Sequence, residues 1–282
     1  MMKSSLVFLG IVSCFCSTFL SAQSFTATIP ETIVSGQGNQ HPQIITNSIG
    51  EPIITWTEST GKNMYYSRKT NSGFSTPTPL NPTSFEVQSY TWSGPNLARW
   101  EQKIYVVFRQ SDYEKGHIYL VKSNDDGQTF GDTIRIDNLD QGFAQYPDVA
   151  VYHDTVFVTF MSHNADGTNP QYVVTRSVDG GQTFETPVET STLLGDEACD
   201  CCPAKIVVNE KYVIQLFRNN ALNIRDIKGV ISYDRGATFN EILEIDNHGW
   251  KINGCPSTGP DAVLNDGQLL TVYKSIENSQ GK

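Results

Sequence analysis

The sequence predicts an all-β protein built from repeated four-stranded sheets, and three periodic features of the chain support this prediction. An octapeptide of the form S-x-D-x-G-x-T-F recurs. A proline precedes a short apolar stretch in each repeat, and an aromatic residue ends the apolar stretch that follows. All three features share one period of fifty-odd residues. Independent motifs with a common period indicate tandem copies of one supersecondary unit.

The octapeptide has three clear copies, which begin at Ser123, Ser177 and Ser232 and therefore lie 54 and 55 residues apart. A degenerate copy covers 67–74. Asp and Ser side chains bond nearby backbone amides in turns, and Gly adopts a positive φ, so we expect a hairpin turn with its Phe packed between sheets. The residues with this structural role are Ser123, Asp125, Gly127, Phe130, Ser177, Asp179, Gly181, Phe184, Ser232, Asp234, Gly236 and Phe239.

The two other periodic features define the strands of each repeat. The prolines are Pro42, Pro95, Pro147, Pro203 and Pro260, and the aromatics are Trp56, Phe108, Phe160, Phe217 and Tyr273. In the second repeat, alternating apolar residues predict strands over 96–100, 103–110, 117–122 and 133–137. Such a repeating unit is typical of a β-propeller blade. We therefore predict blades near 40–82, 93–138, 145–190 and 201–246, and a partial fifth over 258–282.

The N-terminus has the composition of a signal peptide. Lys3 precedes an apolar stretch over 6–20, and small residues surround Ala22, so we expect residues 1–22 to be cleaved. The mature propeller, 23–282, would be secreted or periplasmic; a membrane anchor and a lipoprotein modified at Cys14 are the alternatives. We expect no membrane span in the mature chain. The net charge of −10 repels phosphate backbones, so we expect no nucleic-acid partner.

Four cysteines remain after cleavage, in two loops that each precede a repeat proline: Cys199, Cys201, Cys202 and Cys255. An even number in an exported protein predicts disulfides. We expect Cys255 to pair with one of the other three, with Cys202 or Cys199 favoured. A bond between the neighbours Cys201 and Cys202 is disfavoured because vicinal geometry is strained. A soft-metal site completed by His163 or His248, and a redox role, are the alternatives. We expect no metal ion and no cofactor.

The octapeptides resemble Asp boxes, also called BNR repeats, of the sialidase superfamily. The loops over 195–203 and 246–260 resemble those of a subgroup of secreted bacterial sialidase-like proteins. The resemblance covers about residues 40–280. It implies a six-bladed ring, of which this chain would be a fragment (a small ring is the alternative), with the functional face opposite the Asp boxes. It also implies an exo-acting glycoside hydrolase on sialylated or other acidic glycans; a non-catalytic propeller that binds glycan or protein is the alternative.

On that face, a basic residue follows the repeat aromatic in three repeats, as Arg109, Arg218 and Lys274. We expect the two arginines to direct their guanidinium groups into one cavity and grip a carboxylate or other small anionic ligand; solvated strand ends are the alternative. His163 and Trp250 are further ligand-binding candidates. A retaining sialidase needs an activated Tyr and an acid, for which Asp112, Glu58 and Tyr273 are the candidates, although the family's Arg-Ile-Pro signature is absent.

Overall fold

The computed structural model describes residues 31–58, 63–84, 86–112, 116–195 and 198–276. The chain divides into two compact units, residues 1–32 and 33–282, and every strand below belongs to the second. The expected signal peptide and Cys14 lie outside the described residues. Besides strands, the described residues form two short 3₁₀ helices, Ser191–Leu194 and Ala221–Asn223.

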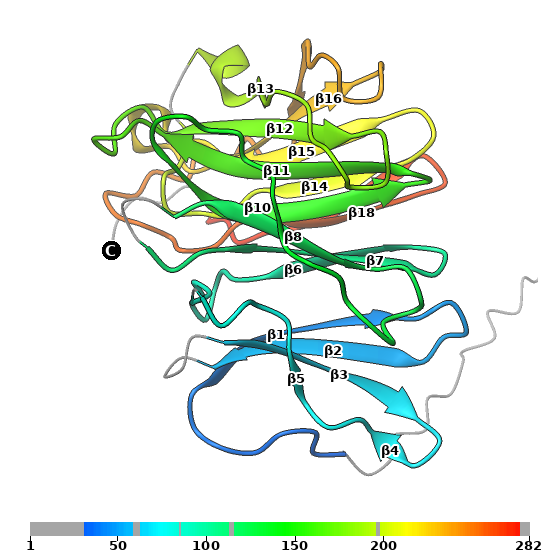
Figure 1. Ribbon diagram of the computed structural model, residues 1–282. Helices are drawn as coiled ribbons and strands as arrows, with labels where there is room; N and C mark the ends of the chain where they lie inside the picture. The colour runs from blue at the N-terminus through cyan, green and yellow to red at the C-terminus, as the bar shows by residue number, and fades with distance from the viewer. Residues whose placement is uncertain (1–30, 59–62, 85, 113–115, 196–197, 277–282) are drawn as a thin grey trace, which may run out of the picture. The chain divides into compact units, whose positions relative to one another are not determined.

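The strands form consecutive antiparallel sheets, each made from one sequence repeat (Figure 1). The first sheet contains β1 (Asn39–Thr46), β2 (Pro52–Glu58) and β3 (Met64–Thr70), with β4 (Gly73–Phe74) and β5 (Thr78–Pro79) both paired to β3. The second contains β6 (Asn96–Trp100), β7 (Lys103–Arg109), β8 (Ile118–Ser123) and β9 (Ile134–Arg135). The third contains β10 (Phe143–Tyr152), β11 (Thr155–His163), β12 (Gln171–Ser177) and β13 (Val188–Glu189).

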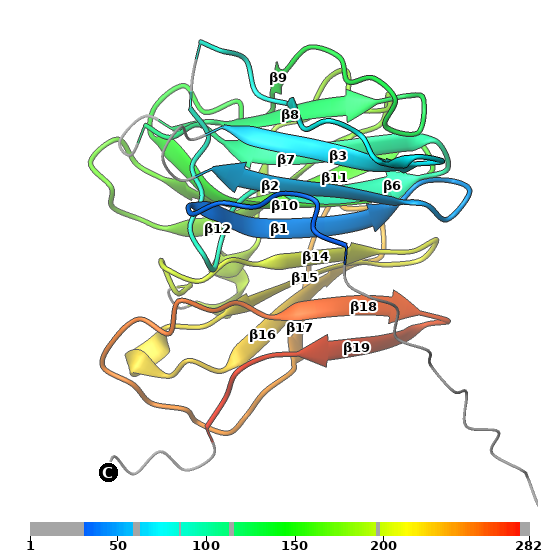
Figure 2. The same cartoon turned by 90° about the horizontal axis from the view of Figure 1, so that it is seen from below.

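The fourth sheet contains β14 (Lys205–Val208), β15 (Val213–Arg218), β16 (Ile227–Ser232) and β17 (Glu241–Glu244). A fifth, two-stranded sheet follows with β18 (Asp261–Asn265) and β19 (Gln268–Val272), which Figure 2 shows as a hairpin. In the second to fifth sheets strand order follows chain order, and in the first sheet β5 departs from it by pairing with β3. This is the blade arrangement of a β-propeller, as the period of the sequence predicts.

The first strands of successive blades contact one another in series, from β1 to β6, β10, β14 and β18. Hydrophobic side chains fill the space between each pair of sheets. Val106 and Phe108 of β7 pack with Ile53 of the first blade, and Phe157 of β11 packs with Phe217 of the fourth. Each sheet is therefore covered by its neighbours on the face that the alternating pattern makes apolar, which buries a core that a single blade could not form.

The three octapeptides form the same hydrogen-bonded turn. In the third blade, Ser177 Oγ donates to Asp179 Oδ1 at 2.6 Å and accepts from the Gly181 amide at 2.7 Å. Asp179 Oδ1 also accepts from the Thr183 amide at 3.0 Å, and Oδ2 accepts from the Thr183 hydroxyl at 2.7 Å. Hydrogen bonds from Ser177 and Thr183 hold the pKa of Asp179 below its usual range, since they favour the ionised carboxylate.

The phenylalanine that ends each octapeptide packs against the preceding blade. Phe130 lies edge-on to Tyr66 of β3, with ring centroids 4.8 Å apart. Phe184 packs against a cluster that includes Tyr105 of the second blade, and Phe239 is buried in a cluster with Phe157 of the third. The motif thus closes a turn and joins two blades at the same time.

We expect Asp179→Ala to lower the free energy of unfolding by about 1 to 3 kcal/mol, because the turn amides lose their acceptor. Thermal or urea unfolding of the purified variant measures the change. Asp132→Ala, at an exposed position in the loop before β9, is the matched control and should change the stability little. A melting temperature unchanged in both variants would show that the turn does not depend on the carboxylate.

Candidate functional site

The two ends of each blade carry different features. In the second blade, Ser123 of the octapeptide pairs with Ile104, at the start of β7, whereas Arg109 at the end of β7 pairs with Ile118. The fourth blade repeats this register, with Ser232 opposite Val213 and Arg218 opposite Ile227. The octapeptides therefore lie at one end of the strands, and the repeat prolines lie near the other. We call the latter the proline end.

A cavity of about 290 Å³ lies where the first strands of all five blades meet at the proline end. The residue that follows each repeat proline lines this central cavity: Gln43, Asn96, Asp148, Ala204 and Asp261. Four of the five side chains are polar. The same position in every repeat is therefore directed into one space, where the polar groups of five blades converge.

Two carboxyl groups in the central cavity share one lysine. Lys205 Nζ lies 3.7 Å from Asp148 Oδ2 and 3.3 Å from Asp261 Oδ1, so these oxygens are no more than about 7 Å apart. The Asp148 side chain is 3% exposed, whereas that of Asp261 is 71% exposed. Burial raises the pKa of Asp148, and the charge of Lys205 partly opposes this. The neighbouring carboxylates in turn raise the pKa of Lys205.

Backbone bulges shape the walls of the cavity in two blades. The register of β1 shifts between Gln40 and Gln43, and that of β10 shifts between Gln145 and Asp148. Inside these bulges His41 and Tyr146 adopt φ values of 49° and 54°. A bulge redirects a side chain at a sheet rim. His41 consequently lines the central cavity beside Trp92, whose ring lies 5.4 Å from that of Tyr146.

A second, lateral cavity of about 600 Å³ lies next to the third blade. It is lined by the aromatic rings of Phe143 and Tyr146, by His163, and by Asp166, Asp200 and Cys201. The imidazole of His163 stacks on Phe143 with centroids 4.5 Å apart, and burial lowers its pKa. His163 is thus the one sequence-predicted ligand-binding candidate that lines either of these two cavities.

The expectation that Arg109 and Arg218 meet in one cavity is corrected by their contacts. Both side chains are buried. Arg109 Nε donates to the carbonyl of Ala144 in the next blade. Arg218 donates to the carbonyls of Arg225, of Thr258 at 3.0 Å and of Lys274 at 3.0 Å. The Arg109 side chain therefore joins its blade to β10, and the Arg218 side chain joins its blade to the segments on either side of the β18–β19 hairpin. These guanidinium donors bond backbone carbonyls.

The two remaining ligand-binding candidates, Trp250 and Lys274, lie near Arg218 and line neither of the two cavities. Trp250 is 2% exposed, and the guanidinium of Arg218 lies 5.0 Å from its ring centroid. Lys274 Nζ lies 5.8 Å from the same ring, and its side chain is exposed. Cation–π stacking of this kind supports the loop before the fifth blade.

The three catalytic candidates lie in three different blades, and none lines the central or the lateral cavity. Glu58 ends β2, and Asp112 lies exposed beyond β7. The Tyr273 hydroxyl donates to the carbonyl of Ile245 at 3.4 Å, and burial raises its pKa. None of the three lines the cavities described above, and the assignment of a sialidase-type set to these residues stays a prediction.

The expectation that Cys255 pairs with one of the other three cysteines is confirmed, but the favoured partner is corrected. Cys255 forms a disulfide with Cys201, and not with Cys202 or Cys199, which are free and buried. The bond spans 54 residues and joins the loops before β14 and β18. Cys201 is half-buried, whereas Cys199 and Cys202 are buried, so the loop before β18 brings the exposed Cys255 to the most accessible of the three.

The central carboxyls had a signal in the sequence. The prolines mark the register, and the next residue is Gln43, Asn96, Asp148 or Asp261 in four repeats. A polar residue that recurs at the start of the first strand in each repeat predicts that these side chains converge near the centre of the propeller. Lys205 lies two residues after its proline, outside this register, so only the structure connects it with both carboxyls.

Comparison with models of known protein families finds no match. No curated protein matches the sequence either. Among the described residues, no helix is long and apolar enough to cross a membrane.

Several solved structures have a similar fold. A protein of unknown function from Dyadobacter fermentans gives a TM-score of 0.63 at 18% identity, over 87% of this chain and 75% of that one. An α-L-arabinanase from Penicillium chrysogenum gives 0.58 at 13% identity, over 86% and 76%. An α-L-arabinofuranosidase from Fusarium graminearum gives 0.56 at 12% identity, over 83% and 74%. At these identities the likeness shows the fold, which is a β-propeller.

Proposed function

We propose that the protein is a glycan-acting propeller of the glycoside hydrolase type, with Asp148 and Asp261 in the central cavity as its reacting carboxyl groups. The observation that carries the proposal is the pairing of one buried and one exposed carboxyl within about 7 Å across Lys205. Glycosidases use two carboxyls, one as acid and one as base or nucleophile, at separations from roughly 5 to 9.5 Å. When one carboxyl group is buried and the other is exposed, their pKa values differ, so that one can act as the acid and the other as the base or nucleophile.

Asp148 would act as the general acid. Its raised pKa keeps the proton available at higher pH than an ordinary aspartic acid would, and it lines the cavity in which a glycan would bind. Asp261 is exposed and lies 3.3 Å from Lys205 Nζ, and it would be the carboxylate that activates water or stabilises positive charge at the sugar. Trp92 supplies an aromatic wall on which a sugar ring can stack.

The arabinan-acting enzymes among the similar structures support a glycan substrate, and so does the resemblance of the octapeptides to Asp boxes. A sialylated substrate is the finer hypothesis. Its support is weaker, because carbonyls engage the forks of Arg109 and Arg218, while Lys205 remains as the cation that lines the central cavity. We therefore favour a neutral or weakly acidic sugar over sialic acid.

Incubation of the secreted protein with fluorogenic glycosides, including an α-L-arabinofuranoside and an α-sialoside, tests the proposal. We expect hydrolysis of at least one member of the panel. Binding to a glycan array without any release of reducing sugar would support a non-catalytic glycan-binding propeller instead. Absence of both binding and turnover would overturn the glycan hypothesis.

The pH dependence of turnover should follow the protonation of Asp148. An acid must be protonated to act, so we expect kcat/KM to fall as the pH rises through the raised pKa of Asp148. Lys205→Met removes the charge that lowers this pKa, so the alkaline limb of the profile should move to higher pH. Lys211→Met, at an exposed position on the loop before β15, is the control and should leave the profile in place. A limb that moves to lower pH in Lys205→Met would contradict the assignment of the acid.

A further inference from the structure

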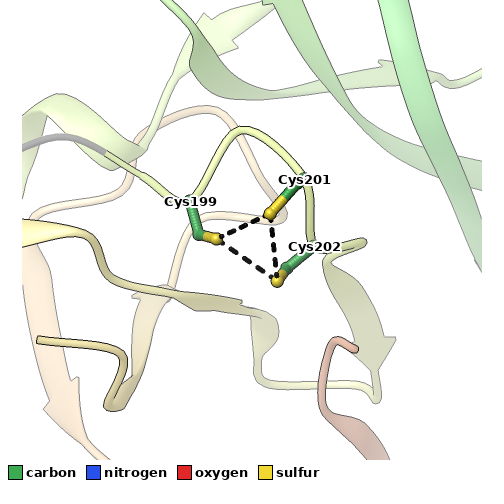
Figure 3. A group of neighbouring side chains, drawn as sticks. All are labelled: Cys199, Cys201 and Cys202. Atoms are coloured by element: carbon green, nitrogen blue, oxygen red, sulfur yellow. Dashed lines mark hydrogen bonds between the residues drawn. The ribbon is translucent and has the colours of Figure 1, made fainter. Parts of the chain in front are cut away.

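Three cysteines of one turn bring their sulfur atoms together. Figure 3 shows Cys199, Cys201 and Cys202 with their side chains facing one another. Cys199 Sγ lies 3.2 Å from Cys202 Sγ and 3.4 Å from Cys201 Sγ, and Cys201 Sγ lies 3.9 Å from Cys202 Sγ. Cys201 is at the same time bonded to Cys255. A free dithiol is therefore in contact with a disulfide.

The dithiol and the disulfide differ in their access to solvent. Cys199 and Cys202 are 1% and 0% exposed. Cys201 is half-buried and lines the lateral cavity, and Cys255 is exposed. An external molecule can thus reach the Cys201–Cys255 bond directly, whereas it can reach the two thiols only through that bond.

The charges around the pair distinguish the two thiols. The hydrogen bond from the Cys199 thiol lowers the pKa of Cys202 to about 7, with further contributions from Arg218 and Arg225 against the effect of burial. The same contact raises the pKa of Cys199. The Tyr172 hydroxyl donates to the Cys202 carbonyl, and the Cys199 amide donates to the Arg218 carbonyl at 2.8 Å, so the backbone of both residues is anchored.

We propose that the four cysteines form a thiol–disulfide exchange site, in which the buried Cys199 and Cys202 pass two electrons through the Cys201–Cys255 bond to a small external disulfide. Cys202, the thiol with the lowered pKa, attacks Cys201 Sγ as thiolate across 3.9 Å. A transient Cys202–Cys201 bond forms, the Cys201–Cys255 bond breaks, and Cys255 leaves as thiolate. Cys199, whose proton passes to Cys255, then attacks Cys202 Sγ, which closes Cys199–Cys202 and releases Cys201 as thiolate.

The surface dithiol completes the transfer. Cys255 attacks the external disulfide and expels one of its thiols, and Cys201 then attacks Cys255 Sγ, which restores the Cys201–Cys255 bond and releases the second thiol. The net change is the oxidation of Cys199 and Cys202 to a disulfide and the reduction of one external disulfide to two thiols. A soft metal ion on the three sulfurs is less favoured, since it would require the Cys201–Cys255 bond to be broken first.

The test begins with full-length secreted protein whose thiol content is set to two per chain, with one equivalent of a phosphine reductant if both pairs are closed on isolation. Oxidised glutathione is added, samples are quenched with acid, and free thiols are alkylated and mapped by mass spectrometry. We expect two reduced glutathione molecules per chain, a closed Cys199–Cys202 bond, and a transient glutathione adduct on Cys255.

A double variant, Cys201→Ser with Cys255→Ser, removes the surface pair and leaves the buried dithiol in place. We expect it to release glutathione at least about ten-fold more slowly, since thiol access governs the exchange rate. An adduct on Cys199 or Cys202, an unchanged rate in the double variant, or no release by the parent protein would each overturn the proposal. If the double variant does not fold, the position of the adduct in the parent protein decides the question.

Discussion

Asp148→Asn should reduce turnover of the best glycoside in the panel by about 10² to 10⁴-fold, the range typical of general acid catalysis. Asparagine has nearly the same shape but cannot deliver the proton. The substitution keeps an oxygen that can accept the hydrogen bond from the Ile206 amide, which lies 2.9 Å from Asp148 Oδ2. The contact between β10 and β14 should therefore persist, and activity should be lost without loss of the fold.

Two measurements separate catalysis from structure in this variant. The melting temperature of Asp148→Asn should remain close to that of the parent, and substrate binding by the inactive protein should persist. Asp266→Asn, at an exposed turn between β18 and β19, is the matched control and should keep full activity. If Asp148→Asn retains turnover, or loses turnover and stability together, Asp148 is a structural residue of the blade junction.

Replacement of Arg218 should have the largest effect on stability. Arg218→Leu removes donors from three backbone carbonyls inside the junction between the fourth and fifth blades. Buried acceptors left without partners make such losses costly, so we expect the free energy of unfolding to fall by about 3 to 5 kcal/mol. Urea unfolding followed by tryptophan fluorescence measures the change, because Trp250 stacks on this guanidinium.

Arg218→Lys distinguishes the structural role from an anion site. Lysine retains the charge but not the planar fork, so it cannot reach the three carbonyls together, and the stability should still fall. Affinity for sialic acid should stay the same once it is corrected for the folded fraction. Arg99→Leu, which removes one surface hydrogen bond to the carbonyl of Glu101, is the control. Weaker sialic acid binding by fully folded Arg218→Lys would restore the anion-site hypothesis.

Much of the fold could be predicted from the chain because its determinants are local. The predicted strand over 96–100 agrees with β6, and the prediction over 103–110 agrees with β7 to within one residue. Alternation with a period of two follows from the strand backbone itself. The octapeptide turn is equally local, since Asp179 bonds groups no more than four residues away. A repeated local unit then defines the blade, and its period defines how the blades follow one another.

The candidate site depended on contacts that no local pattern contains. Asp148 and Lys205 meet across two blades although they are 57 residues apart, and burial then changes the pKa of the acid. The arginines looked like ligand-binding residues in the sequence, yet the neighbouring loops supply carbonyls that occupy their donors. Likewise, the course of the loop before β18 determined that Cys201, rather than Cys202 or Cys199, bonds Cys255. The sequence by itself therefore determined the repeat architecture, because strands and turns depend on neighbouring residues. The chemistry of each side chain was decided only by the tertiary structure, because it depends on which distant groups pack beside that side chain.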